Sequence, residues 1–179
     1  MRKLNMEDLN RLSVEEFKEV KKSPIVIILD NVRSLNNVGS AFRTSDAFLI
    51  EKIFLCGITG KPPHKEIQKT ALGATESVAW EYAGTTLEAI EKLKNSGHLI
   101  CSFEQADKSI MLDKFVPQKD QKYALVFGNE VFGVEEEVIE NSDYVLEIPQ
   151  LGTKHSLNIS VSIGIALWDL SVKMGVLKK

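Results

Sequence analysis

Short aliphatic runs alternate with segments of helical periodicity along the whole chain, and this alternation restricts the possible folds more than any other feature. Residues 25–30, IVIILD, form a continuous aliphatic run that is typical of a strand buried on both faces of a parallel sheet. A helical pattern begins at Asn37 and continues through Phe48, and residues 52–55 then have the pattern of a second strand. The segment therefore predicts a strand–helix–strand unit.

The same alternation continues to the end of the chain. Further strands are expected at residues 78–82, 99–103, 123–128 and 144–148. Helices are expected after Ser13, around residues 64–72, from Thr85 or Thr86 to the stop signal at residues 95–97, and at residues 134–140 and 156–172. The pattern predicts one α/β domain, a parallel sheet sandwiched by helices, over residues 25–179, with residues 1–24 as an N-terminal helical extension.

Composition supports one domain and excludes several classes of protein. The chain has 179 residues, of which 44% are hydrophobic, enough for one substantial core. Its apolar runs are far shorter than the roughly 20 residues of a membrane-spanning helix, and residues 1–10 lack a secretory signal pattern, so we expect a cytoplasmic protein without membrane contact. Cys56 and Cys101 lie in apolar segments without CxxC or Cys/His spacing, which predicts buried, reduced thiols and no metal site.

The net charge of −3 means that the overall field of the protein does not attract a polyanion. Any contact with a nucleic acid must therefore be local. Two groups of basic residues could provide it, although solvated surface lysines are the favoured explanation of each group taken alone: Lys61, His64, Lys65 and Lys69, and Lys173, Lys178 and Lys179.

Common nucleotide-binding fingerprints are missing from the sequence. No GxGxxG follows a strand, and no GxxxxGK[ST] occurs, which disfavours a standard dinucleotide fold or a P-loop enzyme. Instead, three polar segments that contain glycine lie at or directly after predicted strands, at residues 30–48, 125–133 and 148–168. Ligands of open α/β sheets bind beyond the carboxyl ends of the strands, so these segments are the expected site.

The first segment places Asn37, Gly39 and Arg43 in the first turns of a helix. Asn37 and Arg43 then have nearby but not identical bearings on the helix. A helix start combined with an arginine suits a phosphate or a carboxylate. The alternative is a capped helix with Arg43 in a surface ion pair.

The second segment brackets Asn129 and Glu130 between Gly128 and Gly133. Gly128 would let a ligand approach the backbone, and Glu130 could bind a cation, an amine or an arginine. A plain strand-to-helix turn explains the glycines equally well.

The third segment opens the last predicted helix. Ser156 there is either a helix N-cap or part of a site, and as an isolated signal the N-cap is favoured. Ser156, Ser160 and Gly164 are spaced four apart on one face, so another backbone could approach that face closely.

Together the three segments resemble the motifs of the SpoU (TrmH-like) family of SPOUT RNA 2'-O-ribose methyltransferases, over residues 25 to about 172. The N-x-G-x-x-x-R motif is matched by Asn37, Gly39 and Arg43. The F-G-N-E-x-x-G motif is matched over residues 127–133, and I-P-M-x-G-x-x-x-S-L-N-V-S over residues 148–160. In the third motif Gln150 replaces methionine and Ile159 replaces valine, which are mild departures.

This resemblance implies properties that composition and periodicity do not reveal. The C-terminal part of the sheet would be threaded into a deep trefoil knot, and the protein would be a homodimer with its active site near the subunit interface. S-adenosyl-L-methionine would bind to the loops around Ser102, Phe103, Gly128, Ile148, Ser156 and Leu157. The catalytic and RNA-binding group would be Asn37, Arg43, Glu130, Ser156 and Asn158.

The implied reaction is attack of a ribose 2'-hydroxyl on the sulfonium methyl group, for which no metal is needed. The role of Arg43 is divided between that of a base and that of a phosphate-assisted stabiliser, because the ordinary pKa of arginine lies above about 12. Glu130 and His155 are alternative proton acceptors by residue chemistry, and His155 is the weaker candidate since the motif does not specify its position.

Two other functions remain open at this stage: a non-catalytic module that binds RNA or adenosylmethionine, and a knotted base methyltransferase. Intact Asn37, Arg43, Glu130 and Asn158 argue against the first, and the Ser-Leu-Asn segment with Arg43 favours ribose over base. Only residues 1–22 precede the first predicted strand, so tRNA, recognised by the catalytic dimer itself, is slightly favoured over rRNA.

Overall fold

The computed structural model describes residues 1–5 and 7–177. Seven strands form one sheet in the order β3-β2-β1-β6-β4-β7-β5, and each pair of neighbouring strands is parallel. The strands are β1 (Ser23–Asp30), β2 (Ile50–Cys56), β3 (Trp80–Ala83), β4 (His98–Phe103), β5 (Ile110–Met111), β6 (Lys122–Phe127) and β7 (Tyr144–Glu147). The predicted α/β architecture with a parallel sheet is confirmed.

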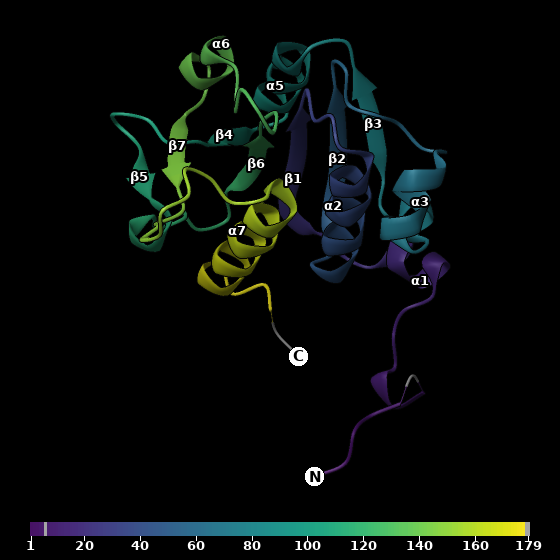
Figure 1. Cartoon of the computed structure of the whole chain (residues 1–179). Helices are drawn as coiled ribbons and strands as arrows, with labels where there is room; N and C mark the ends of the chain where they lie inside the picture. The colour runs from purple at the N-terminus through teal and green to yellow at the C-terminus, as the bar shows by residue number, and fades with distance from the viewer. Residues whose placement is uncertain (6, 178–179) are drawn as a thin grey trace.

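Helices cover both faces of this sheet (Figure 1). They are α1 (Val14–Glu19), α2 (Leu35–Ala47), α3 (Lys65–Ala71), α4 (Ala74–Ser77), α5 (Thr86–Asn95), α6 (Glu136–Glu140) and α7 (Ile159–Lys173), with the 3-10 turns η1 (Glu7–Leu9) and η2 (Leu112–Lys114). Residues of α1, α2, α3, α4 and α7 pack in one apolar cluster, and residues of α5 and α6 pack in another on the opposite face.

Strand β1 shows why the central strands are aliphatic throughout. Ile25, Ile27 and Leu29 point into the first cluster, whereas Val26 and Ile28 point into the second. All five side chains are at most 1% exposed. A strand that is buried on both faces needs apolar side chains at every position, which is the pattern that predicted it.

The helix predicted after Ser13 is present as α1, and the residues before it extend away from the rest of the molecule. Ser13 and Glu16 make the reciprocal hydrogen bonds of a capping box at the start of α1, and Phe17 of that helix is buried in the first cluster. The described residues before α1 project from the sheet and its helices (Figure 1). No helix in the described part of the chain combines the length and apolarity needed to cross a membrane.

The last helix begins later than predicted. Its N-cap is Asn158, whose Oδ1 accepts the Ser160 backbone N–H at 2.8 Å, so α7 starts at Ile159 and not at Ser156. Both residue types are good caps, and the interpretation of Ser156 as the cap is wrong because Ser156 lies in the preceding loop. The proposed face of small residues therefore contains only Ser160 and Gly164.

Short elements escaped the sequence analysis. Helix α4 and strand β5 have four and two residues, too few to display a period. Strand β5 pairs with β7 through Ile110 and Met111, in the stretch between the expected strands at residues 99–103 and 123–128. Pairing with an existing strand edge, and not local pattern, decides its conformation.

Gly39 of the first motif is a packing residue between α2 and α3. A Cβ added there would lie 2.1 Å from Thr70 Oγ1 and 2.3 Å from the Ile67 carbonyl oxygen. Thr70 Oγ1 donates a hydrogen bond to the Asn36 carbonyl at 3.0 Å, which fixes the two helices in this close approach. The glycine of the motif thus sets the position of α2 against α3.

We expect Gly39→Ala to lower the free energy of unfolding by about 1–3 kcal/mol, because the backbone carbonyl of Ile67 must move. Gly152→Ala is the matched control, since no atom lies within 4 Å of a Cβ at that position and its φ is ordinary. Urea titration of both variants measures the effect. Equal stability of the two variants would contradict the packing role.

Candidate functional site

A cavity of about 570 Å³ opens at the carboxyl ends of β4, β6 and β7. Its lining comes from residues 103–105, 127–133, 146–148, 150, 155–159 and 162. These residues include large parts of the second and third motifs, far apart in the sequence. The expected location of the site, beyond the carboxyl ends of parallel strands, therefore has a cavity of the size that small-molecule ligands occupy.

Most of the predicted donor-binding residues line this cavity: Phe103, Gly128, Ile148, Ser156 and Leu157. Ser102 does not. It is fully buried in β4, and its Oγ lies 2.7 Å from Ser142 Oγ in a hydrogen bond. Alternation along the strand turns Phe103 toward the cavity and Ser102 away from it.

Glycines shape the loop after β6. A Cβ on Gly128 would lie 2.1 Å from the carbonyl carbon of Gly133, so backbone occupies the space that was expected to admit a ligand. Asn129 N–H donates to the Gly133 carbonyl at 2.8 Å, and Gly133 N–H donates to the Asn129 carbonyl at 2.9 Å. Residues 129–133 form a closed loop along one wall of the cavity.

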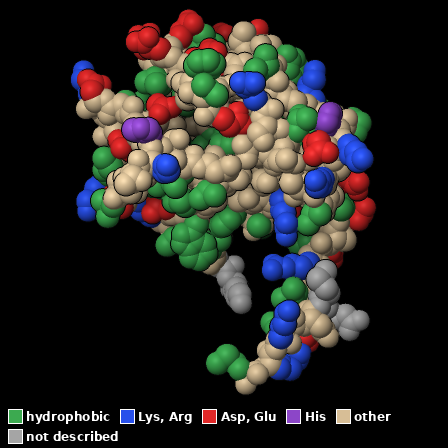
Figure 2. Space-filling model, in the orientation of Figure 1, with side chains coloured by type: hydrophobic (Ala, Val, Ile, Leu, Met, Phe, Trp, Pro, Cys, Tyr) green, Lys and Arg blue, Asp and Glu red, His purple; other side chains and the backbone are tan. Residues whose placement is uncertain are grey.

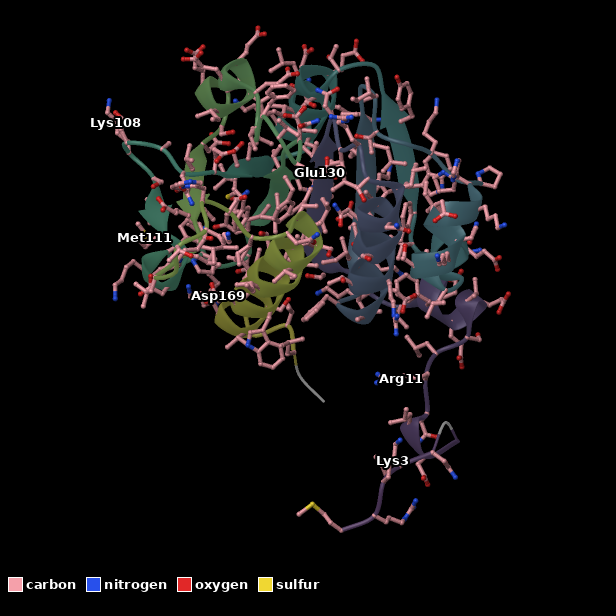
Figure 3. The ribbon with its side chains drawn as sticks, viewed as in Figure 1. Lys3, Arg11, Lys108, Met111, Glu130 and Asp169 are labelled. Carbon is pink, nitrogen blue, oxygen red and sulfur yellow. The ribbon has the colours of Figure 1, made fainter. Side chains whose placement is uncertain are left out.

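Glu130 joins the first motif to the second. Its carboxylate accepts hydrogen bonds from the backbone N–H groups of Arg33 and Ser34 and from Asn37 Nδ2, each at 3.0 Å. Figure 3 shows Glu130 near the upper end of α7. The geometry shows a neutral amide and two backbone donors as its partners, in place of the expected cation, amine or arginine.

These contacts determine the protonation state of Glu130. Burial by itself raises the pKa of the carboxyl, but the hydrogen bonds from Arg33, Asn37 and Ser34 outweigh it and hold the pKa below its ordinary value. Glu130 is therefore ionised at neutral pH, with both oxygens engaged. A carboxylate in this state is a poor proton acceptor and a good fixed anchor.

Asn37 and Asn158 connect the same cluster to α7. Asn158 Nδ2 donates to Asn37 Oδ1 at 3.3 Å, while Asn158 Oδ1 accepts from the Ser160 backbone and hydroxyl. Residues of all three motifs thus meet in one hydrogen-bonded chain from Glu130 through Asn37 to Asn158. Ser156 lies beside it on the cavity wall, exposed to solvent.

Arg43 lies outside this cluster. It is exposed on α2, and it forms no hydrogen bond or ion pair with any residue that the structure describes. Six residues of helix place it about 9 Å along the axis from Asn37 and about 120° around it, so the expectation of nearby bearings is wrong. A single chain therefore brings together Asn37, Glu130, Ser156 and Asn158 of the predicted catalytic group, and leaves Arg43 apart.

His155 lines the cavity from the loop before α7. Its backbone carbonyl accepts a hydrogen bond from Gln105 Nε2 at 2.8 Å, which ties this loop to the end of β4.

Within the described residues no group of three or more His, Cys, Asp or Glu side chains is arranged to hold a metal ion.

Sequence reasoning missed Asp30 and Asn31, which organise the loops around the site. Asp30 is fully buried at the end of β1 and accepts hydrogen bonds from Thr86 Oγ1 at 2.6 Å and Glu135 N–H at 3.1 Å. Its partners begin α5 and precede α6. A charged residue that ends an otherwise apolar strand was the available signal.

Asn31 extends this network to the second motif. Its carbonyl accepts from Asn129 Nδ2 at 2.8 Å, and its Nδ2 donates to Glu135 Oε1 at 2.8 Å. The backbone at Asn31 has a φ of 53°, in the left-handed region that asparagine tolerates better than most residues. These contacts hold the loop of Glu130 against the end of β1.

The fold and the cavity define a parallel α/β protein with a cavity of ligand size beyond the carboxyl ends of its strands. The SpoU rRNA Methylase family matches residues 24–168, and the chain belongs to this family. It is 30% identical to an uncharacterized tRNA/rRNA methyltransferase of Borreliella burgdorferi, covering 92% of this chain and 70% of the relative. It is also 28% identical to the 23S rRNA (guanosine-2'-O-)-methyltransferase RlmB of Neisseria meningitidis, covering 88% of this chain and 62% of that enzyme.

Solved structures share this architecture. The TrmH/SpoU tRNA modifying enzyme of A. aeolicus superposes with a TM-score of 0.80 at 26% identity, over 91% of this chain and 81% of its own. The AdoMet-bound rRNA methyltransferase of Sinorhizobium meliloti also gives a TM-score of 0.80 at 25% identity, over 91% of this chain and 61% of its own. The resemblance inferred from the three motifs is confirmed.

Glu130 should make the stability of the protein depend on pH. A carboxyl whose pKa is lowered by folding stabilises the fold above its unfolded pKa, near 4.3, and this contribution is lost as the pH falls through the folded pKa. We expect Glu130→Gln to lower the free energy of unfolding at pH 7 by on the order of 1 kcal/mol, a value that allows for solvent screening of a part-exposed group. Denaturant unfolding at a series of pH values from 3 to 7 measures this.

The difference between the wild type and Glu130→Gln should shrink toward acid pH. Glu136→Gln is the control, because Glu136 is exposed in α6 and accepts no hydrogen bond from another side chain in the described residues. A constant difference at all pH values would show that the loss comes from packing and not from charge.

Proposed function

We propose that this protein transfers a methyl group from S-adenosyl-L-methionine to a ribose 2'-hydroxyl in RNA. One observation carries the proposal: the loops of the second and third motifs wall a single cavity, and Glu130, Asn37 and Asn158 join all three motifs beside it. The names of relatives add support, since RlmB of Neisseria meningitidis is a 2'-O-methyltransferase and the Sinorhizobium meliloti structure is bound to AdoMet.

The lining of the cavity fits the proposed donor. Phe103, Ile148 and Leu157 offer apolar surface for an adenine ring, and the backbone of residues 128–133 offers polar groups close by. Once bound, S-adenosylmethionine supplies an electrophilic methyl group on its sulfonium centre. The protein must then orient an RNA hydroxyl in line with that group and exclude water, which is a task of positioning.

The residues of the cluster serve this positioning. Glu130 stays ionised and fixes the loop of residues 33–37, so it acts as an anchor and leaves proton acceptance to another group. Asn37 and Asn158 orient each other beside the cavity. Arg43 clamps the phosphate next to the reacting ribose, since a guanidinium binds phosphate through two parallel hydrogen bonds.

Arg43 acts, in this proposal, in a site completed by a second copy of the chain. Val161, Ile165, Trp168 and Val172 of α7 are 49%, 38%, 60% and 53% exposed and share one face of the helix. Figure 2 shows hydrophobic side chains gathered over the lower end of α7. A homodimer that covers this face would bring the exposed Arg43 of one copy toward the cavity of the other.

The deep trefoil knot expected from the resemblance is part of the proposal. Strand β6 lies between β1 and β4, and β4 lies between β6 and β7, so the chain returns across its own earlier strands. The loops that follow β4, β6 and β7 are the three that wall the cavity.

We propose tRNA as the first substrate class to test, since the A. aeolicus enzyme of the same architecture modifies tRNA.

The decisive experiment maps ribose methylation by mass spectrometry in total RNA from cells with and without the gene. Loss of one 2'-O-methylated nucleotide, restored by the purified protein with S-adenosylmethionine, is the expected result, and the position identifies tRNA or rRNA. Loss of a base methylation would favour the knotted base methyltransferase. Normal methylation in both samples, together with RNA binding, would favour the non-catalytic module.

We expect Arg43→Ala to abolish methyl transfer and to leave donor affinity within about twofold, because the donor cavity is built without Arg43. Stability should change by less than about 0.5 kcal/mol, as is usual for an exposed side chain without partners. Arg43→Lys should also fail, since an ammonium lacks the planar fork. Methyl-transfer assays and titration calorimetry measure these values, with Lys94→Ala on the opposite face of the sheet as control.

A charge on the apolar face of α7 should separate the copies. Trp168→Glu is expected to shift the protein from dimer to monomer in sedimentation velocity and to remove methyl transfer with it, because an ionised carboxylate cannot be buried unpaired. Val116→Glu is the control, because Val116 is 81% exposed and outside this face. A monomeric wild type, or an active monomeric variant, would refute the shared site.

A further inference from the structure

The closed loop of residues 129–133 presents an aromatic ring to solvent at the edge of the cavity. Phe132 is 81% exposed although it belongs to the cavity lining. The other two phenylalanines of the lining, Phe103 and Phe127, stack on each other with ring centroids 4.8 Å apart. Among the described residues no ring stacks on Phe132, and no cation lies over it.

The backbone that carries this ring is fixed before any ligand arrives. Asn129 Oδ1 accepts the N–H groups of Val131 at 2.8 Å and Phe132 at 3.2 Å. Two backbone hydrogen bonds between Asn129 and Gly133 close the loop. Asn129 Nδ2 also donates a hydrogen bond to the Asn31 carbonyl, which attaches the loop to the end of β1. A preorganised loop loses little conformational entropy when a partner binds to its tip.

The position of Phe132 relative to Glu130 limits what that partner is. Two residues separate their Cα atoms by at most about 7.6 Å along the chain. In a nucleotide the base is attached to C1', one bond from the C2' that carries the hydroxyl. If that hydroxyl reacts beside Glu130, the base of the same nucleotide must lie within a few ångströms of the hydroxyl. The base is then within reach of the Phe132 ring.

One exposed arginine lies near the loop and fits an RNA partner, whereas the residues that follow the loop, Glu135 to Glu137, are acidic. The exposed Arg33 sits at the first motif, and its backbone N–H donates to Glu130 at 3.0 Å. An exposed aromatic ring and an exposed arginine on two loops that contact each other are a combination that binds single-stranded nucleic acid, since a ring stacks on a base and a guanidinium binds a phosphate.

We propose that Phe132 is the stacking platform for the base of the nucleotide that is methylated, a role that rests on the proposed function. The ring holds the base outside the RNA stack, and this contact fixes the ribose with its 2'-hydroxyl facing the cavity. Stacking recognises the flat face of any base, so Phe132 adds affinity and orientation and does not choose the base.

The test compares Phe132→Ala, Phe132→Leu and Phe132→Tyr with the wild type, using unfractionated tRNA from cells that lack the gene, or rRNA if the methyl group maps there. The alanine and leucine variants are expected to lower kcat/KM for RNA by about fivefold or more, the low end of an aromatic–base stack. Phe132→Tyr keeps the ring and should stay within twofold. Val116→Ala, which removes an equally exposed apolar side chain away from the cavity, should have no effect.

Calorimetry with S-adenosylhomocysteine and sedimentation velocity separate this role from two others. Weaker donor binding by Phe132→Ala would place the ring in the donor site, and a shift from dimer to monomer would place it against a second copy. Either result overturns the proposal, as does a leucine variant as active as the wild type. If the wild type transfers no methyl group, the proposed function fails, and filter binding of the same RNA to the wild type, the three Phe132 variants and Val116→Ala still measures the stacking role.

Discussion

The parallel pairing of β1 with β6 is the constraint on which the site depends. Ile25 pairs with Tyr123 and Leu29 with Phe127, so two strands about 100 residues apart in the sequence end at the same height. The first motif follows one strand and the second motif follows the other. Glu130 can therefore accept hydrogen bonds from Arg33, Ser34 and Asn37 only because the sheet sets these loops side by side.

Buried polar groups at the end of β1 then fix what the sheet brings together. Asp30 has no contact with water, and its hydrogen bonds are satisfied by Thr86, Glu135 and Asn31. A buried carboxylate must keep such partners, so the loops that supply them cannot move independently. The rigid wall of residues 129–133, with Phe132 at its tip, follows from this network and from the absence of room for side chains at Gly128.

The geometry assigns several motif residues to roles other than those their residue types suggest. Glu130 was an alternative proton acceptor by residue chemistry, but its lowered pKa and its engaged oxygens make it an anchor. Gly39 and Gly128 belong to the motifs and serve close packing of backbone, which a glycine in a motif does not reveal by itself. Arg43 keeps its role within the proposed dimer, because in one chain it is exposed on α2 and apart from the cluster of Asn37, Glu130 and Asn158.

The sequence by itself determined the α/β class, the order of the long elements and the family, because strands buried on both faces and amphipathic helices leave local patterns and the motif residues stand at fixed spacings. It did not determine β5, the start of α7 at Ile159, or the turn of Ser102 away from the cavity. Only the tertiary structure decided these features, and the network of Asp30 and Asn31, because each depends on partners far away in the chain. Strand pairing and the satisfaction of buried polar groups are long-range interactions, and no local pattern records them.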